Sequence, residues 1–202
     1  MNTTMAGRGA FYTDDLGTSL RMAQAIGLTS TAFLAGKTFA ASFSTTRALL
    51  EAPAPLLAKQ WKTQYEADKI VSPAISLFSA VVFGYISYRD NAWTKTSILY
   101  ATSSTLLLSL VPYTFLLSEP INQKLLQKES TLASVSPTDS KAEAGIAKED
   151  SVHGLVDKWA TVNFGRFAIA AVAAIVSTWA AIDRAEVVPA AIRFASGADR
   201  MR

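Results

Sequence analysis

The sequence contains no cysteine and only one histidine, His153, among its 202 residues. Without cysteine the chain has no disulfide, no thiolate nucleophile and no Cys ligand for zinc or an iron–sulfur cluster. One imidazole is too few for a two-His iron triad, for bis-His haem or for a His-rich metal site. We therefore expect no metal site, and an enzyme built from this chain would depend on carboxylates, amides, hydroxyls, Arg, Lys and one His.

Motifs for nucleic-acid or nucleotide binding are also missing. The 19 Lys and Arg residues are scattered among 16 Asp and Glu residues, and the net charge is only +3. A protein that binds nucleic acid usually gathers its basic residues on one face. The sequence has no P-loop, and the Gly7 and Gly9 pair lacks the third glycine and the preceding strand of a dinucleotide-binding fingerprint. We therefore expect no nucleic-acid partner.

Apolar residues dominate what the chain does contain. Half of its residues are hydrophobic, and a mean hydropathy of +0.23 is high for a soluble protein. Uncharged runs cover residues 70–88, 96–118 and 167–182, and a first apolar stretch runs from residue 22 to 43 with Lys37 inside it. A run such as 96–118 is long enough to cross a bilayer core about 30 Å thick. Since no strand-like alternation persists, the predicted fold class is all-α, a four-helix transmembrane bundle of up-down topology.

Composition divides the chain into three parts. Residues 1–18 are polar and lack the basic region and short apolar core of a cleaved signal peptide. The four-helix membrane domain is predicted over residues 19–188, with a flexible loop at about residues 129–150, where Ser, Thr, Pro, Glu and Lys leave almost nothing to bury. Residues 189–202 are predicted to form an amphipathic C-terminal tail that lies on a surface or frays.

Prolines predict where helices start and bend. Pro55 is expected in the first turn of the second helix, where its missing N–H costs nothing. Pro73 is expected to kink this helix where it enters the apolar zone. Ser118 as a cap and Pro120 in a first turn predict that a new helix starts there and leaves the apolar zone.

The start of the last apolar stretch carries three large polar side chains. At about 100° per residue, Trp159, Asn163 and Arg166 fall within a sector of about 60° on a helix. They form one polar stripe where the helix enters uncharged surroundings, which marks a functional site by default. The alternative is that Arg166 and Trp159 only anchor a helix end at a membrane interface.

Alternating helices predict that polar residues from all four meet. In a membrane-spanning up-down bundle, the first and third helices end, and the second and fourth begin, on one side. These places hold, in chain order, Lys37; Trp61, Tyr65 and Asp68; Asn122; and Trp159, Asn163 and Arg166. At the opposite side, the short turn from Arg89 to Lys95 offers little comparable. For Trp61 and Tyr65, a place in the aromatic belt of the interface is an equally good explanation.

Few side chains are available to accept a proton at this site. If the fourth helix is continuous, His153 lies about 120° around it from Trp159, off the polar stripe. A solvated histidine near a fraying helix start is therefore the simpler explanation. Asp68 and Asp157 are further candidates, although charged residues near helix ends usually face water.

Several of these features occur in a fixed order. The chain has a first helix with small residues, then Trp61 to Tyr65, then Pro-x-Asn-x-x-Leu at residues 120–125 and Trp-x-x-x-Asn-x-x-Arg at residues 159–166. In this order they resemble the anthrone oxygenase family of small membrane proteins. The resemblance implies a four-helix membrane protein, often encoded with fungal polyketide pathways, that oxidises an anthrone to an anthraquinone with O₂ and without a recognised cofactor. It also implies an integral membrane location, for which we expect the endoplasmic reticulum.

The resemblance suggests roles for the converging residues. A protein that promotes this oxidation binds a flat apolar polyphenol, removes a proton and stabilises the resulting oxyanion. The implied roles are Arg166 and Asn163 for the enolate oxygen, Trp159 for stacking on the rings with Trp61 beside it, and Asn122 and Tyr65 for the phenolic hydroxyls. The base stays open between His153, Asp157 and a pocket that simply favours the anion.

Two other classes of protein fit the same pattern. A non-catalytic membrane scaffold or small-molecule carrier would use the polar stripe for helix packing, with Asn163 bonding across helices. A soluble helical bundle would bury the same apolar runs in a protein core. The pattern specifies no oligomeric state.

Overall fold

The structure, a computed structural model, describes residues 16–90 and 93–198, with side chains described up to Arg184. No strand occurs in this part of the chain. Its elements are α1 (Thr18–Ala40), the π-helical turn η1 (Ala41–Thr45), α2 (Thr46–Leu49), α3 (Ala54–Arg89), α4 (Lys95–Tyr113), the π-helical turn η2 (Thr114–Ser118), α5 (Glu119–Leu132), the 3-10 turn η3 (Lys148–Asp150) and α6 (Val152–Ala198).

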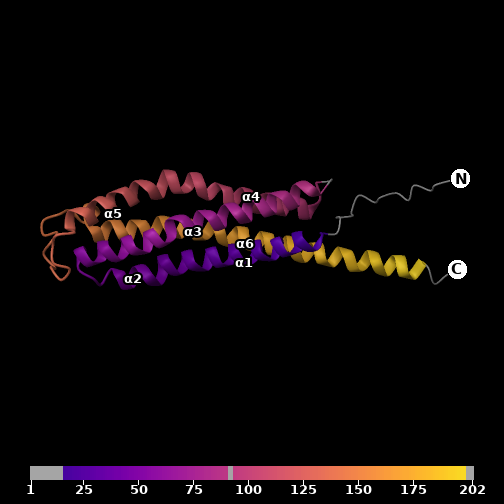
Figure 1. Ribbon diagram of the computed structural model, residues 1–202, viewed down its shortest axis with the longest axis horizontal. Coiled ribbons are helices and arrows are strands. Elements are labelled where there is room, and N and C mark those ends of the chain that lie inside the picture. Colours follow the sequence, from indigo (N-terminus) through magenta and orange to yellow (C-terminus); the bar gives the residue numbers. More distant parts are fainter. Residues whose placement is uncertain (1–15, 91–92, 199–202) are drawn as a thin grey trace.

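The helices form four long rods that lie side by side and alternate in direction (Figure 1). α2 continues α1 and α5 continues α4, so each rod begins at one end of the bundle and finishes at the other. The prediction of an all-α bundle with up-down topology is confirmed.

Three of the rods are long and apolar enough to cross a membrane. They are Ala54–Arg89, Lys95–Leu132 and Val152–Arg184, and this fits an integral membrane protein. The sequence predicted four such helices, but among the described residues the first rod does not qualify, because Gln24, Lys37 and several Thr and Ser residues lower its hydropathy. Its outer face still exposes large apolar side chains, including Met22, Ile26 and Phe33.

Side-chain hydroxyls join the helices inside the apolar half of the bundle. Ser76 and Ser104 each donate to a backbone carbonyl across the α3–α4 contact, at 2.8 Å from Leu107 O and Ala80 O respectively. In a membrane-spanning bundle such bonds and small residues hold helices together, since lipid removes most of the hydrophobic drive for their association.

Among the residues whose side chains are described, the buried apolar ones form two separate clusters. One lies in the half that holds Phe83 and Leu107, and the other surrounds Leu57, Trp61 and Val156. All five of these side chains are completely buried. On α3, residues 64–77 lie between the two clusters, and this is where the bundle is hollow.

Several predicted boundaries differ from the observed ones. Pro55 lies in the first turn of α3 as predicted. Ser118 and Pro120, however, do not start a separate helix, because α4 passes through η2 directly into α5 and Ser118 caps nothing. The wide turn accommodates Pro120, whose ring and missing N–H are incompatible with a regular α-helical turn before it.

The predicted loop contains the last residues of α5 and the turn η3, and α6 extends into the predicted tail. Glu143 ties the connection between α5 and α6 in place, since it pairs with Lys128 at 2.9 Å and accepts a bond of 2.8 Å from the backbone N–H of Val152. α6 does not end before the predicted tail but continues through Pro189 to Ala198. Residues 1–15 and 199–202 lie outside the described residues.

Candidate functional site

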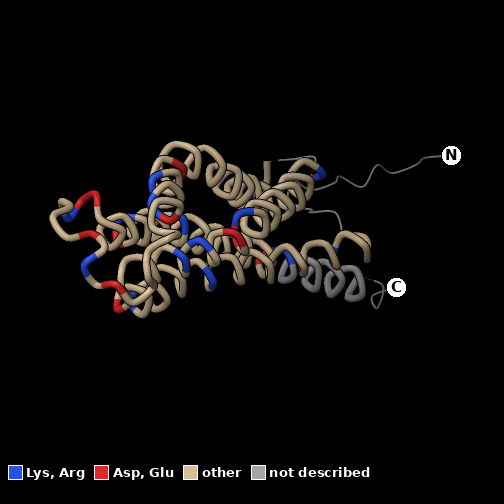
Figure 2. The backbone as a smooth tube through the Cα atoms, turned by 60° about the vertical axis from the view of Figure 1, so that its left-hand side comes forward, with Lys and Arg blue, Asp and Glu red and all other residues tan. Residues whose placement is uncertain are grey.

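A cavity of about 650 Å³ lies between the two core clusters. All four rods contribute to its wall. Among the residues that line it are Lys37, Tyr65, Asp68, Asn122, Trp159, Asn163 and Arg166. The alternating helices thus bring these polar side chains to one place, at the depth where the uncharged runs of α3, α4 and α6 meet the charged end of the bundle. Figure 2 shows the charged residues gathered toward the end that holds α5 and the following loop.

Both π-helical turns form part of the cavity wall. Ala41 and Thr45 of η1 line it from one side, and Thr114, Phe115 and Ser118 of η2 line it from another. A π turn inserts an extra residue into a helix and rotates everything after it, and such turns occur frequently at functional sites. Here η2 determines which residues at the start of α5 face the cavity.

Arg166 contributes a guanidinium to the wall. Its Nη1 donates to Asn163 Oδ1 at 3.3 Å, while its buried Nε has no partner. Among the described residues no carboxylate lies within ion-pair distance of this guanidinium. Arg166 is half-buried, and a cation partly withdrawn from water without a counter-charge is costly. The site therefore favours an anion or a negatively polarised oxygen.

Asn163 lines the cavity and also contacts this arginine. It is almost completely buried, and its Nδ2 donates to Thr38 O at 3.3 Å and to Ser42 Oγ at 2.9 Å, both on the first rod. Both amide hydrogens are therefore used, and the amide oxygen is directed at Arg166. The structure makes Asn163 a link between the first rod and the guanidinium, whereas the sequence suggested a direct role in binding an oxyanion.

Lys37 and Asp68 form an ion pair in the same cavity wall. Lys37 Nζ pairs with Asp68 Oδ1, and Ser72 Oγ donates to the same carboxylate oxygen at 2.7 Å. The charge of Lys37 is thereby neutralised inside the bundle, as expected for a charged side chain in a membrane helix. This explains how the first rod carries a lysine within its apolar stretch.

The start of α5 offers hydrogen-bond acceptors to the cavity. Asn122 Nδ2 donates to Glu119 Oε2 at 3.2 Å, and this contact leaves Asn122 Oδ1 buried without a partner. Gln64 Oε1, across the cavity on α3, is also buried and unpartnered. A ligand that carries hydroxyl groups would satisfy both oxygens, because buried polar atoms rarely stay unpaired.

Three predicted site residues do not line the cavity. Trp61 is fully buried behind it, stacked on Tyr65 at 5.2 Å between ring centroids and edge-on to Trp159 at 6.3 Å. His153 lies near the loop end, where its Nε2 is 3.0 Å from Ala52 O. Asp157 is exposed. The structure therefore separates both predicted bases from Arg166, and it gives Trp61 a supporting position behind Tyr65 and Trp159.

The wall also contains four residues that were not predicted to line a site: Gln64, Ser72, Ser118 and Glu119. Glu119 ends the longest uncharged run and looked like a boundary marker for a membrane segment. The one available signal was its spacing from Asn122, since residues three apart share a helix face. Within the described residues, no three His, Asp or Glu side chains gather as a metal site requires.

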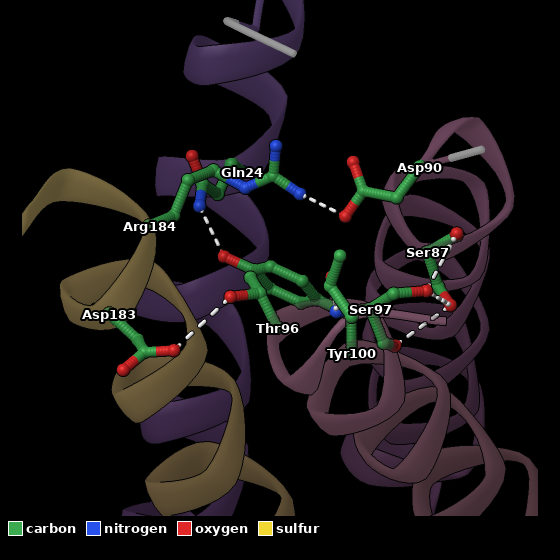
Figure 3. A network of polar contacts seen from close by, with 9 residues as sticks. Gln24, Ser87, Asp90, Thr96, Ser97, Tyr100, Asp183 and Arg184 are labelled. Carbon is green, nitrogen blue, oxygen red and sulfur yellow. Dashed lines mark hydrogen bonds and ion pairs between the residues drawn. The ribbon is translucent and has the colours of Figure 1, made fainter. Parts of the chain in front are cut away.

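A second polar cluster occupies the opposite end of the bundle, where the sequence predicted little of interest. Figure 3 shows Arg184 of α6 paired with Asp90 just after α3, with Tyr100 receiving a bond from Gln24 nearby. The Arg184 and Asp90 side chains are only 8% and 3% exposed. The prediction for this end was wrong because the partners are far apart in sequence.

Fold and cavity together define the class of this protein: a helical integral membrane protein with a small-molecule-sized cavity inside its bundle. The sequence profile of the family described as anthrone oxygenase matches residues 61–176, more than half of the chain. The matched segment includes wall residues from α3, α4, α5 and α6. The chain belongs to the anthrone oxygenase family.

Two curated relatives are fungal. The chain is 26% identical over 143 residues to anthrone oxygenase encC of Aspergillus fumigatus, which covers 66% of this chain and 78% of that protein. It is also 26% identical over 152 residues to anthrone oxygenase AgnL2 of Paecilomyces divaricatus, covering 73% of this chain and 88% of the relative. No solved structure gives a significant match.

Proposed function

We propose that this membrane protein oxidises a hydroxylated anthrone to an anthraquinone with O₂ and without a cofactor, in the membrane of the endoplasmic reticulum. The observation that carries the proposal is Arg166, a cation in the cavity wall that has no carboxylate partner among the described residues, in a member of this family. The cavity volume of about 650 Å³ falls within the range of roughly 300–1,000 Å³ found for small-molecule sites.

The reaction balances as one anthrone and one O₂ giving one anthraquinone and one water. Removal of a methylene proton leaves an electron-rich anthranolate, which reduces O₂ and forms a carbon–oxygen bond to a hydroperoxide. Loss of the second hydrogen from this carbon as a proton breaks the O–O bond, and the oxygen that departs leaves as water. The protein has to supply a pocket, a base and a stabiliser for the oxyanion.

Arg166 supplies the oxyanion stabilisation in this proposal. Its free N–H groups donate to the oxygen that becomes negative when the proton leaves, and Asn163 keeps the guanidinium aimed at that position. Trp159 and Tyr65 provide aromatic faces for a flat ring system, with Trp61 behind them. Asn122 Oδ1 accepts from a phenolic hydroxyl of the ligand.

A non-catalytic carrier of the same class of ligand is the second candidate. The observation in its favour is that Asn163 bonds to the first rod through both amide hydrogens, as a purely structural residue would. A carrier would bind the polyphenol in the same cavity and leave its spontaneous oxidation unchanged.

Oxygen uptake separates the two candidates. Purified protein in detergent is incubated with a hydroxylated anthrone, and O₂ consumption and quinone absorbance are followed against the spontaneous rate. We expect acceleration that survives exhaustive chelation, and a loss of about 10²- to 10³-fold in Arg166→Ala. Arg166→Lys keeps the positive charge but lacks the forked pair of N–H donors. This variant should therefore retain only part of the wild-type acceleration. Binding of the anthrone without faster O₂ uptake would support the carrier. Microscopy of a fluorescent fusion protein would test the proposed location in the endoplasmic reticulum.

A further inference from the structure

The proposed oxidation requires a group that takes the methylene proton, and neither base suggested by the sequence is in the cavity. His153 contacts Ala52 O near the loop end, and Asp157 is exposed on α6. A general base has to reach the proton directly or through one water. The proton acceptor must therefore be sought among the side chains of the wall.

Two carboxylates line the cavity in the described part of the chain, Asp68 and Glu119. They differ in what surrounds them. Asp68 is paired with the Lys37 ammonium and also accepts from Ser72. Protonation of Asp68 would leave the Lys37 charge without its partner inside the bundle, and an uncompensated charge there is expensive. Asp68 is thus committed to neutralising Lys37.

Glu119, in contrast, forms no ion pair with a described residue. No Lys, Arg or His among the described residues lies within ion-pair distance of its carboxylate. Its two oxygens accept from neutral amides only, Oε2 from Asn122 at 3.2 Å and Oε1 from Gln123. A carboxylate offers about four lone-pair positions, so Glu119 can take up a proton without breaking an ion pair.

The position of Glu119 also suits the ligand. It is the first residue of α5, directly after the wide turn η2, while Arg166 comes from α6. Both line the same cavity but form no ion pair across it. In an anthrone the ketone and the methylene lie at opposite positions of the central ring, so a site needs its cation and its base apart, with the ligand between them.

We propose that Glu119 is the general base of the oxidation, an inference that rests on the function proposed above. The Glu119 carboxylate takes one methylene proton, and the C–H electron pair moves into the ring to give the anthranolate at Arg166. The anthranolate carbon bonds to O₂, which is reduced to a peroxide and receives the proton from Glu119. Glu119 then removes the second hydrogen as a proton, the O–O bond breaks as the ketone forms, and the departing hydroxide takes that proton as water.

Proton exchange without oxygen tests this step in isolation. An anthrone is incubated anaerobically with the full-length protein in D₂O, and deuterium uptake at the methylene is followed by NMR. We expect the wild-type protein to accelerate exchange and Glu119→Gln to lose about 10²- to 10⁴-fold of that acceleration. Glutamine has the same shape as glutamate, and its side-chain oxygen can still accept the hydrogen bond from Asn122. A loss of exchange would therefore not result from displacement of the Asn122 side chain. Binding of the anthraquinone product should be retained, which shows that the variant is folded.

The matched control is Glu66→Gln, which makes the same change at an exposed residue of α3 outside the cavity. It should exchange like the wild type. Glu119→Ala with added acetate gives an independent measurement, and we expect exchange to rise with acetate concentration. If Glu119→Gln exchanges deuterium as fast as the wild-type protein, Glu119 is not the base, but the proposed function still stands. Failure of the wild-type protein to accelerate both exchange and O₂ uptake overturns the proposed function as well.

Discussion

The Nη1 of Arg166 donates to the amide oxygen of Asn163, one turn earlier on α6, at 3.3 Å. Asn163 is in turn bound to Thr38 and Ser42 of the first rod. The orientation of the guanidinium therefore depends on contact between two helices that are far apart in the chain. Loss of this contact would leave Arg166 in place but poorly aimed, and a misplacement of about 1 Å is enough to cost about 10²-fold in rate.

Asn163→Asp is predicted to inactivate the protein without removing Arg166. The substitution is isosteric and puts a carboxylate next to the guanidinium. The new aspartate then neutralises the positive charge of Arg166, which would otherwise stabilise the ligand oxyanion. We expect turnover to fall by about 10²-fold or more, as with loss of one oxyanion donor. Steady-state O₂ uptake with a hydroxylated anthrone measures this effect.

Ser42→Ala is the control for this prediction. It removes one of the two acceptors of Asn163 Nδ2 and leaves Thr38 O in place. The expected cost is about 1 kcal/mol, which is a less than tenfold effect. Equal turnover of Asn163→Asp and the wild type would mean that the unpaired charge of Arg166 is not used.

The Lys37 and Asp68 pair is predicted to be coupled in stability. Their side chains are 25% and 31% exposed, so the pair lies between a buried and a surface ion pair. We expect Lys37→Met or Asp68→Asn alone to lower the free energy of unfolding by roughly 1–3 kcal/mol, since each leaves a polar partner behind. Thermal unfolding in detergent provides the measurement.

The double variant Lys37→Met and Asp68→Asn should be less destabilised than the sum of the two single variants. A strictly additive result would show that the two charges act independently. Any loss of turnover in the single variants should then track loss of folded protein, because Asp68 is assigned to Lys37 and not to the ligand.

Much of the fold was predictable because it depends on local composition. The three uncharged runs predicted the helices of three of the four rods. The 3.6-residue period of a helix predicted that Trp159, Asn163 and Arg166 share one helix face. The direction of successive helices followed from the need to cross the apolar zone repeatedly. These arguments need only residues that are near one another in the chain.

The contribution of α5 could not be predicted in the same way. The π turn η2 shifts the helical register by one residue, which rotates Glu119 and Asn122 by about 100° relative to α4. No residue pattern in this sequence marks that turn. The Arg184 and Asp90 pair was equally hidden, because its partners are 94 positions apart and meet only when α6 packs beside the α3–α4 turn.

Gly165→Ala is predicted to disrupt the contact between α4 and α6. A Cβ at this position would lie 2.0 Å from the Tyr113 hydroxyl oxygen, and that hydroxyl donates to Val162 O at 2.9 Å. The ring has to move and the bond is lost, so we expect a destabilisation of about 1–3 kcal/mol. Gly36→Ala is the control, because nothing lies within 4 Å of a Cβ there. Equal stability of the two variants would contradict the observed packing.

The ion pair between Asp90 and Arg184 is predicted to stabilise the bundle without affecting the cavity (Figure 3). Asp90→Ala removes one charged hydrogen bond from a nearly buried guanidinium, which we expect to cost about 1.5–3 kcal/mol. Lys95→Ala breaks the neighbouring contact with Asp183, but Lys95 is 65% exposed, so the expected cost is below about 1 kcal/mol. Both variants should bind the anthraquinone product like the wild type at temperatures where they are folded. Weakened binding by folded Asp90→Ala would instead show that the two ends of the bundle are energetically coupled, since this pair and the cavity share no residue.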